Sequence, residues 1–333
     1  MSAIKVSKRG GVKEVFDAKK IEKVLAWAVD GLEGVSVEEL QAATKLMYFD
    51  GIKTSDIHNG LITAAGSVIS LDKGNYTFVA ARLLLQKLYK ETAGGIEYPS
   101  LESYINKGVE EGVLNPQLLT FDMKRLEAEI DPKRDFLFTY LGLQTLADRY
   151  FIRTQQKAGK DNRIIEMPQH FWMRVAMGLC LNEQAREDKA IEFYHLLSKL
   201  DFVDSTPTLF NSGTKHSQLS SCYLNTVADS ISADPGQNKY ASIFGTIEEC
   251  ANLSKYAGGI GTDWTRVRPE GDPIIGTNGK SSGIVPYLKV FNDTAVAVNQ
   301  CFAPDTLVRV PDGVRAIQDV QVGDLVLGMR GIS

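Results

Sequence analysis

Apolar positions at the start of the chain recur first at strand spacing and then at helix spacing. Two short β-prone runs, residues 4–9 and 12–16, flank Gly10-Gly11, a pair typical of a tight hairpin turn. Four segments with an apolar position every three or four residues follow, and this spacing predicts four helices. Because a lone hairpin is marginal in water, we expect the helices to cover it and to form one module with it.

Polar residues mark where the first three helices begin. Asp17 is placed to cap the first helix, and Ser36 and Glu39 have the spacing of a capping box for the second. Thr54 or Ser55 is expected to cap the third helix. These caps predict helix boundaries that the hydrophobic spacing alone leaves open.

Helical spacing continues well beyond this module. A fourth helix is predicted over residues 76–92, ending at Gly94. Residues 96–200 are mostly helical in pattern, and Pro168 is placed to begin one of these helices. Over residues 201–300, Pro, Gly, Ser and Asn break the chain into short segments. This pattern is typical of strands, loops and one or two helices at the start of an α/β barrel, so the predicted fold class is α+β.

The pattern changes once more in residues 301–333. This segment is β-rich, with a Pro-Asp-Gly turn at 311–313 and alternating apolar positions at Val320, Val322 and Leu325, and no helix is expected in it. The chain is therefore divided into residues 1–95, 96–200, 201–300 and 301–333.

Composition narrows the class of protein. Hydrophobic residues make up 44% and charged residues 23% of the chain, as in ordinary globular domains. No apolar run is long enough to cross a bilayer and the N-terminus lacks a secretory signal, so we expect a cytoplasmic protein without a membrane partner. A net charge of -4 gives no sign of a nucleic-acid partner. The four cysteines, which never form a CxxC pair, predict no metal site.

Basic and hydroxyl side chains gather around the predicted hairpin and helix starts of the first module. A helix N-terminus with basic neighbours favours a phosphate, although solvated surface lysines would give the same composition. The strings VSKRGG, KKIEKVLAWAVDGL and FDGIKTSDIH resemble the ATP-cone of ribonucleotide reductases, which senses ATP against dATP. The resemblance implies an effector site made by Lys8, Arg9, Glu14, Lys20, Thr54, His58, Lys87 and Lys90.

Residues 201–300 carry a second resemblance. DSTPTLFNSGT, SQLSSCYLNTVADS and YAGGIGTDWTRVR resemble the opening of the reductase barrel. The resemblance makes Cys222 one of two cysteines that are oxidised to a disulfide as the substrate loses its 2′-hydroxyl. It also implies substrate contacts from Thr206, Ser221, Gly258 and Gly259, and specificity-effector contacts from Asp229, Ser254 and Arg268. Cys180 and Cys250 match no functional position and are expected to be packing residues.

The same resemblance implies cofactors and partners. A class I, diphosphate-using reductase has its radical cofactor in a separate small subunit, forms a large-subunit homodimer and is reduced by thioredoxin or glutaredoxin. The family's radical-bearing cysteine, second redox cysteine and catalytic Asn and Glu are absent from these 333 residues. This chain alone is therefore expected to be inactive.

The segment from Cys301 resembles the start of an intein. CFAPDTLVRVPDG is similar to the first intein block and VQVGDLVLG to its continuation. Cys301 would then attack the carbonyl of Gln300 and convert that peptide bond to a thioester. The Thr-x-x-His block and terminal Asn that an intein needs are missing, so we expect either a partner chain with the C-terminal intein fragment and the rest of the subunit, or a truncated gene record.

Two other functions stay open at this point. An adenosylcobalamin-dependent reductase carries motifs similar to SSCYLN. A regulatory protein that uses only the nucleotide module would never catalyse, but it would have no use for the substrate loop and redox cysteine of residues 201–300.

Overall fold

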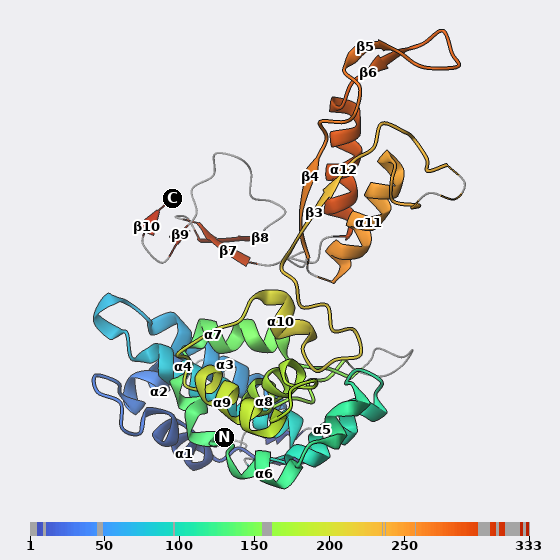
Figure 1. Cartoon of the computed structure of the whole chain (residues 1–333). Coiled ribbons are helices and arrows are strands. Elements are labelled where there is room, and N and C mark those ends of the chain that lie inside the picture. The colour runs from blue at the N-terminus through green and yellow to red at the C-terminus, as the bar shows by residue number, and fades with distance from the viewer. Residues whose placement is uncertain are drawn as a thin grey trace. The chain divides into compact units, whose positions relative to one another are not determined.

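The structure is a computed structural model of the chain, and it divides into two compact units. The first unit comprises residues 1–204 and 209–217, and the second comprises 205–208 and 218–333. Figure 1 shows the helices of the first unit and the mixed helices and strands of the second. The structure describes residues 5–8, 11–44, 49–95, 97–154, 162–234, 236, 238–256, 258–298, 307–310, 313–316, 327–328 and 331–332.

The first unit is a small hairpin followed by helices. Its strands and longer helices are β1 (Lys5–Ser7), β2 (Lys13–Val15), α1 (Ala18–Val29), α2 (Val37–Thr44), α3 (Thr54–Val68), α4 (Tyr76–Thr92), α5 (Leu101–Glu110), α6 (Met123–Ala128), α7 (Tyr140–Thr145), α8 (Pro168–Leu179) and α9 (Arg186–Ser198). Short helical turns lie between them: η2 (Leu71–Lys73), η3 (Pro116–Thr120), η4 (Pro132–Leu137) and η5 (Leu146–Tyr150). The hairpin, the fourth helix over 76–92 and the Pro168 start are confirmed.

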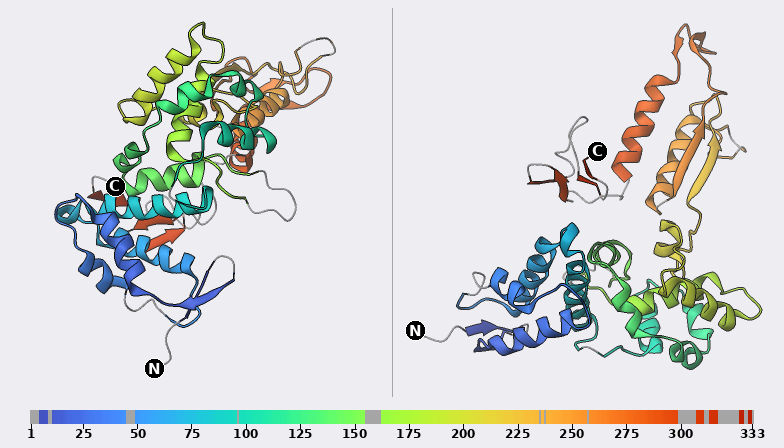
Figure 2. Two further views of the ribbon diagram at one scale, coloured as in Figure 1. Left: turned by 90° about the horizontal axis from the view of Figure 1, so that it is seen from below. Right: turned by 90° about the vertical axis from the view of Figure 1, so that its left-hand side faces the viewer.

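Hydrogen bonds on both edges of β1 bring the hairpin to the start of α3. On one edge β1 pairs antiparallel with β2. On the other edge Ser7 N donates to Ile52 O (2.9 Å) and Gly51 N donates to Lys5 O (2.8 Å). The segment that leads into α3 therefore runs beside β1. As a result, residues far apart in sequence share one end of the unit (Figure 2).

The predicted helix caps are only partly confirmed. Asp17 caps α1, because its Oδ1 accepts from Lys19 N at 3.0 Å. Ser36 Oγ accepts from Glu39 N at 3.3 Å, which is the first bond of a capping box. The second bond, from Ser36 N to the Glu39 carboxylate, does not form. Ser36 N donates to the Tyr76 hydroxyl instead, and the Glu39 carboxylate accepts from that same hydroxyl. A tertiary contact with α4 thus replaces a local one.

The cap predicted for the third helix is wrong. α3 begins at Thr54, so its N-cap is Lys53, which makes no capping bond through its side chain. Lys53 is extended, because its backbone forms a bridge with Ser7 of β1, and the helix begins at the next residue. Thr54 is therefore the first residue inside the helix and not its cap.

One core runs through the helices of the first unit, and a separate small cluster of Val6, Ile52 and Ile57 packs the hairpin against the start of α3. The larger core joins α1 to α4 with α5 to α9, so residues on both sides of position 95 bury their apolar side chains together.

Among the buried polar side chains are two hydrogen-bonded clusters, one around Glu166 and one around Asp135. The Arg174 guanidinium donates to the Glu166 carboxylate at 2.7 Å, both side chains being fully buried, and the Tyr104 hydroxyl donates to Glu166 as well.

The second cluster surrounds the buried Asp135. Its carboxylate accepts hydrogen bonds from the hydroxyls of Tyr89 on α4 and Tyr98, and from the Gln169 amide on α8 at 2.6 Å. Burial raises the pKa of the Asp135 carboxyl to about 6, against the lowering effect of these three donors. The aspartate thus joins α4 to the later helices.

The second unit contains the predicted strands, loops and helices. After α10 (Thr206–Asn211), which both units share, come β3 (Cys222–Thr226), α11 (Ile243–Lys255), β4 (Gly259–Asp263), β5 (Glu270–Pro273), β6 (Lys280–Ser282) and α12 (Val285–Val298). β3 and β4 are parallel with α11 between them in sequence, which is the strand–helix–strand unit of α/β folds. α12 packs against α11 (Figure 1).

The end of the chain is β-structured where the structure describes it. β7 (Leu307–Val310) and β8 (Gly313–Ala316) form an antiparallel hairpin, and β9 (Leu327–Gly328) pairs with β10 (Gly331–Ile332). The pair Val310↔Gly313 flanks the predicted turn. Cys301, Val320, Val322 and Leu325 lie outside the described residues. Within the described part of 301–333 there is no helix.

Candidate functional site

Four of the eight predicted effector residues line one cavity of about 130 Å³ between the hairpin, α1 and α3. We call it the α1–α3 cavity. Thr54 faces it because the helix begins one residue earlier than predicted. The lining residues are Val6, Glu14, Phe16, Asp17, Lys20, Ile21, Val24, Thr54, Ile57, His58 and Leu61.

The polar side of the α1–α3 cavity is formed by the charged side chains of Glu14 and Lys20 and by the imidazole of His58. Glu14 forms ion pairs with Lys8 (2.6 Å) and with Lys20 (3.1 Å). Hydrogen bonds from Lys8 and then Lys20 hold the pKa of the Glu14 carboxyl below its usual value. His58 Nε2 lies 2.7 Å from Leu83 O, and since a carbonyl only accepts, this nitrogen carries the proton. Nδ1 of the neutral ring is then an acceptor.

The other predicted effector residues lie elsewhere. Lys8 pairs with Glu14 but does not line the α1–α3 cavity, and Arg9 lies outside the described residues. Lys87 and Lys90 line a different cavity, of about 580 Å³, together with Arg153 and Arg163. The predicted set is therefore divided between two cavities of the first unit.

The Cys222 region brings together four predicted residues at the start of the β3–β4 pair. Cys222 stands opposite Gly259 in the parallel register, and Gly259 N donates to Ser221 O at 2.6 Å. A Cβ on Gly259 would lie 3.0 Å from Ser221 O and 3.4 Å from Cys222 Sγ. A Cβ on Gly258 would lie 3.0 Å from the Tyr223 ring. Both glycines therefore allow the strands to approach beside an exposed thiol.

Thr206 stands at the exposed start of α10. Two residues later, the hydroxyl of Thr208 donates to Leu219 O at 3.3 Å and lies 3.3 Å from the Ser205 hydroxyl. The bond to Leu219 O joins the start of α10 to the loop that leads into β3. The other two cysteines that the structure describes, Cys180 and Cys250, are buried.

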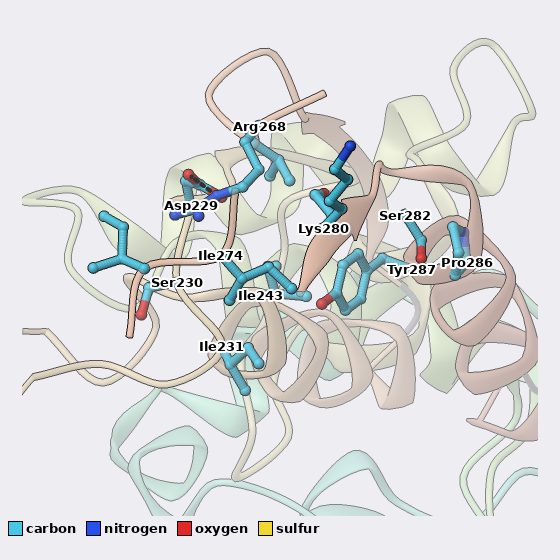
Figure 3. A pocket seen from close by; sticks show the side chains of 13 residues that line it. Asp229, Ser230, Ile231, Ile243, Arg268, Ile274, Lys280, Ser282, Pro286 and Tyr287 are labelled. Carbon is cyan, nitrogen blue, oxygen red and sulfur yellow. Dashed lines mark hydrogen bonds and ion pairs between the residues drawn. The ribbon is translucent and has the colours of Figure 1, made fainter. Parts of the chain in front are cut away.

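A cavity of about 440 Å³ lies beside the β5–β6 hairpin, and we call it the β5–β6 cavity. Asp229 and Arg268 form an ion pair at its edge, with Arg268 Nε 2.8 Å from Asp229 Oδ2 (Figure 3). Arg268 also donates to Pro273 O at 2.8 Å, which fixes its guanidinium against β5. The lining residues are Asp229, Ser230, Ile231, Ile243, Val267, Arg268, Ile274, Ile275, Lys280, Ser281, Ser282, Pro286 and Tyr287.

The residues that line the β5–β6 cavity differ in two ways from the specificity-effector residues predicted from the sequence. Ser254, on α11, is not among its lining residues. Lys280, Ser282 and Tyr287 do line it and were not predicted (Figure 3). The Gly-Lys-Ser-Ser-Gly string at 279–283 offered a signal for the first two, since it combines a cation with hydroxyl donors.

Neither a metal-binding cluster nor a membrane-spanning helix is present among the described residues. They contain no group of three or more His, Cys, Asp or Glu side chains placed to hold a metal ion. Among these residues, no helix is both long and apolar enough to cross a membrane.

Comparisons with known protein families match three consecutive parts of the chain. The ATP cone domain matches residues 4–91, the all-alpha domain of ribonucleotide reductase matches 136–217, and the barrel domain of ribonucleotide reductase matches 220–302. These matches place the chain in the ribonucleotide reductase class. More specifically, they show the N-terminal region of a large subunit, with an ATP cone, an all-alpha domain and barrel-domain sequence.

Individual relatives agree with this assignment. The chain is 42% identical over 298 residues to the ribonucleoside-diphosphate reductase subunit alpha of Helicobacter pylori (strain ATCC 700392 / 26695), covering 89% of this chain and 36% of that protein. It is 43% identical over 306 residues to the subunit alpha of Chlamydia pneumoniae, covering 89% and 28%. With the large subunit of Plasmodium falciparum (isolate Dd2) it shares 38% over 259 residues, covering 76% and 30%. The chain thus spans about a third of the length of the curated relatives it matches.

Proposed function

We propose that the chain is the N-terminal portion of a ribonucleoside-diphosphate reductase large subunit and reduces ribonucleotides to deoxyribonucleotides only when the rest of the subunit is joined to it. The observation that carries this proposal is the pairing of an exposed Cys222 with Gly259 at the start of the β3–β4 pair, within the barrel-domain match. The names of the relatives favour a diphosphate substrate.

Cys222 supplies one of two thiols in the proposed reaction. Two thiols lose two electrons and two protons and form a disulfide. At C2′ of the substrate the C–OH bond is replaced by a C–H bond, and the hydroxyl leaves as water. Thr206, Ser221 and the backbone at Gly258 and Gly259 hold the sugar and phosphate. The glycines suit this role because a side chain at either position would meet neighbouring atoms at about van der Waals distance or closer.

Two nucleotide sites regulate this activity in our proposal. ATP or dATP binds in the α1–α3 cavity, where the start of α3 and the Lys20 ammonium favour phosphate. A specificity effector binds in the β5–β6 cavity beside Asp229 and Arg268. The contacts predicted from Lys8, Lys87, Lys90 and Ser254, which lie outside the two cavities, and from Arg9, which lies outside the described residues, stay predictions.

The proposal includes partners that supply what this chain lacks. A small subunit provides the radical cofactor, a second large subunit forms the homodimer, and thioredoxin or glutaredoxin reduces the disulfide, all in the cytoplasm. The test is to join residues 1–300 to the remaining large-subunit sequence, add the small subunit and measure reduction of CDP. We expect turnover that Cys222→Ser abolishes, with Cys250→Ser retaining most of it. Equal turnover in the Cys222→Ser variant would refute the role of this thiol.

We also propose that Cys301 begins an intein fragment that joins the two parts of the subunit. The β7–β8 hairpin around residues 311–312 supports this proposal, as does the end of the barrel-domain match at residue 302. The Cys301 thiol would attack the Gln300 carbonyl, and the amide would become a thioester with release of the Cys301 amine.

Splicing is tested by co-expressing the chain with a reading frame that carries the remaining large-subunit sequence. Mass spectrometry should then detect a product ligated directly after Gln300, and Cys301→Ala should prevent its formation. If wild-type co-expression gives only two intact chains, splicing is refuted while the reductase proposal stands.

A further inference from the structure

A third cavity in the first unit, of about 400 Å³, has no part in the proposed reaction. We call it the aromatic cavity. Its size falls in the range of about 300–1,000 Å³ that is usual for small-molecule sites. Residues of α1 and α4 form one side, and residues between α4 and α7 form the other. They are Lys23, Val24, Trp27, Gln86, Tyr89, Tyr98, Pro132, Lys133 and Phe136.

The rings in this cavity are arranged edge to face. Trp27 and Phe136 have their centroids 5.8 Å apart and their planes at 63°, and Tyr89 and Tyr98 are 5.7 Å apart at 68°. In such pairs one ring keeps its faces clear of the other ring. Planar aromatic ligands stack on ring faces of this kind.

The charge of the aromatic cavity is positive. Lys23 and Lys133 line it, and within the described residues neither ammonium group has an ion-pair partner. No acidic side chain is among the lining residues. The Arg82 guanidinium lies 5.0 Å from the Phe136 centroid and adds to the positive charge nearby. The buried Asp135 lies behind the hydroxyls of Tyr89 and Tyr98.

From these features we infer that the aromatic cavity binds a small planar aromatic anion, an aromatic ring that carries a phosphate or a carboxylate. The ring packs among Trp27, Phe136 and the tyrosines, and the anionic group binds Lys23 and Lys133. Such a ligand contacts both α1 and α4 of the ATP cone and the helical region that follows it. This inference is independent of the proposed reductase activity.

The test measures binding to the full 333-residue chain by calorimetry with four probes. Phenyl phosphate and benzoate carry ring and charge, methyl phosphate carries only the charge, and benzyl alcohol only the ring. We expect phenyl phosphate or benzoate to bind at least about tenfold more tightly than methyl phosphate and benzyl alcohol, because ring stacking and a charge-assisted contact each contribute. The better of the two identifies the anionic group.

Charge reversal locates the site. Lys23→Glu with Lys133→Glu should weaken the best probe by at least about tenfold, since two attractions become repulsions. Lys107→Glu with Lys124→Glu, at exposed positions outside the cavity, is the matched control and should change the affinity less than about twofold. Equal loss in both double variants, or no loss in the first, would overturn the inference.

A competition experiment separates this site from the α1–α3 cavity, because Val24 lines both. We expect the best probe to bind with unchanged stoichiometry when dATP is present in excess. Displacement of the probe by dATP would place it in the α1–α3 cavity and overturn the inference. Failure of dATP itself to bind would weaken the proposed regulation and leave the result for the aromatic cavity intact.

Discussion

The described cysteines of this chain differ in reactivity because they differ in burial. Cys180 and Cys222 are both free thiols, yet one is fully buried and the other is exposed. Burial raises the pKa of the Cys180 thiol to about 11, and it raises that of Cys250 as well. The sequence motif SSCYLN pointed to Cys222, but only the structure shows which thiols solvent reaches.

Alkylation should therefore discriminate among these three cysteines. At pH 8 about one Cys180 thiol in a thousand is ionised, given its pKa of about 11, and the thiolate is the reactive form. We expect brief treatment of the native chain with iodoacetamide to modify Cys222 well before Cys180 and Cys250, as read by peptide mass spectrometry. The unfolded chain is the control and should lose this order. Equal labelling in the native chain would contradict the exposure of Cys222.

The buried Asp135 predicts a pH dependence of stability. Its folded-state pKa of about 6 lies above the ordinary aspartate value, so the folded state binds a proton more tightly than the unfolded state. The stabilisation is complete below about pH 4 and is lost as the pH rises to about 6. Two pKa units correspond to about 3 kcal/mol.

Asp135→Asn keeps the shape of this side chain and removes its titration. Between pH 4 and 6, the unfolding free energy of the wild type should fall relative to that of Asp135→Asn by about 2 kcal/mol of this total. Chemical denaturation at several pH values measures this difference. His170, whose pKa burial lowers to about 3, is present in both proteins and cancels in the comparison. A constant difference across this range would contradict the raised pKa.

At the scale of elements, local sequence predicted most helix positions and failed where tertiary contacts compete. Pro168 begins α8 as predicted, because a proline at the first helical position loses no hydrogen bond. Ser36 and Glu39 form only half of a capping box, because the Tyr76 hydroxyl bonds to both. Nothing in the local sequence indicates that contact from residue 76. Similarly, the spacing of lysines did not reveal that Lys87 and Lys20 line different cavities.

At Gly178, α8 packs so closely against the turn at residues 212–213 that there is no room for a side chain. A Cβ at this position of α8 would lie 2.1 Å from Gly213 N and 2.3 Å from Ser212 Oγ. Since the backbone cannot yield easily, Gly178→Ala should lower the unfolding free energy by about 1–3 kcal/mol.

The matched control is Gly95→Ala, where a Cβ meets nothing within 4 Å. Without a clash, this substitution should be neutral or stabilise the chain by less than about 1 kcal/mol, through the unfolded state. Urea denaturation of both variants makes the comparison. Equal destabilisation would contradict the close approach of α8 to the 212–213 turn.

At the scale of the whole molecule, the two units differ in how well they bury apolar surface. The first unit has a core that runs from α1 to α9. The second has four buried apolar residues in its cluster, and among the described residues of α12 none is buried. Leu224 on β3 is 89% exposed and Val285 on α12 is 72% exposed. Exposed apolar side chains of this kind mark a surface suited to packing against other protein.

Sequence motifs indicated the order of the parts and most of the candidate residues. The motif around Cys222 and the glycine run are local in sequence, and parallel pairing of β3 with β4 places them together. By contrast, Lys280, Ser282 and Tyr287 line one cavity with Arg268 only through the folding of the β5–β6 hairpin and α12, which short-range patterns do not encode. The aromatic cavity combines residues from 23 to 136, a separation too long for any motif.

Binding of dATP to the full chain tests the central claim most directly, because the ATP cone match, residues 4–91, lies within it. Calorimetry should give a dissociation constant between about millimolar and micromolar. His58→Ala, which alters the α1–α3 cavity, should weaken binding at least about tenfold, or ~1.4 kcal/mol, whereas Lys107→Ala should leave it unchanged. Absence of dATP binding to the wild type, or equal affinity in His58→Ala, would contradict the account.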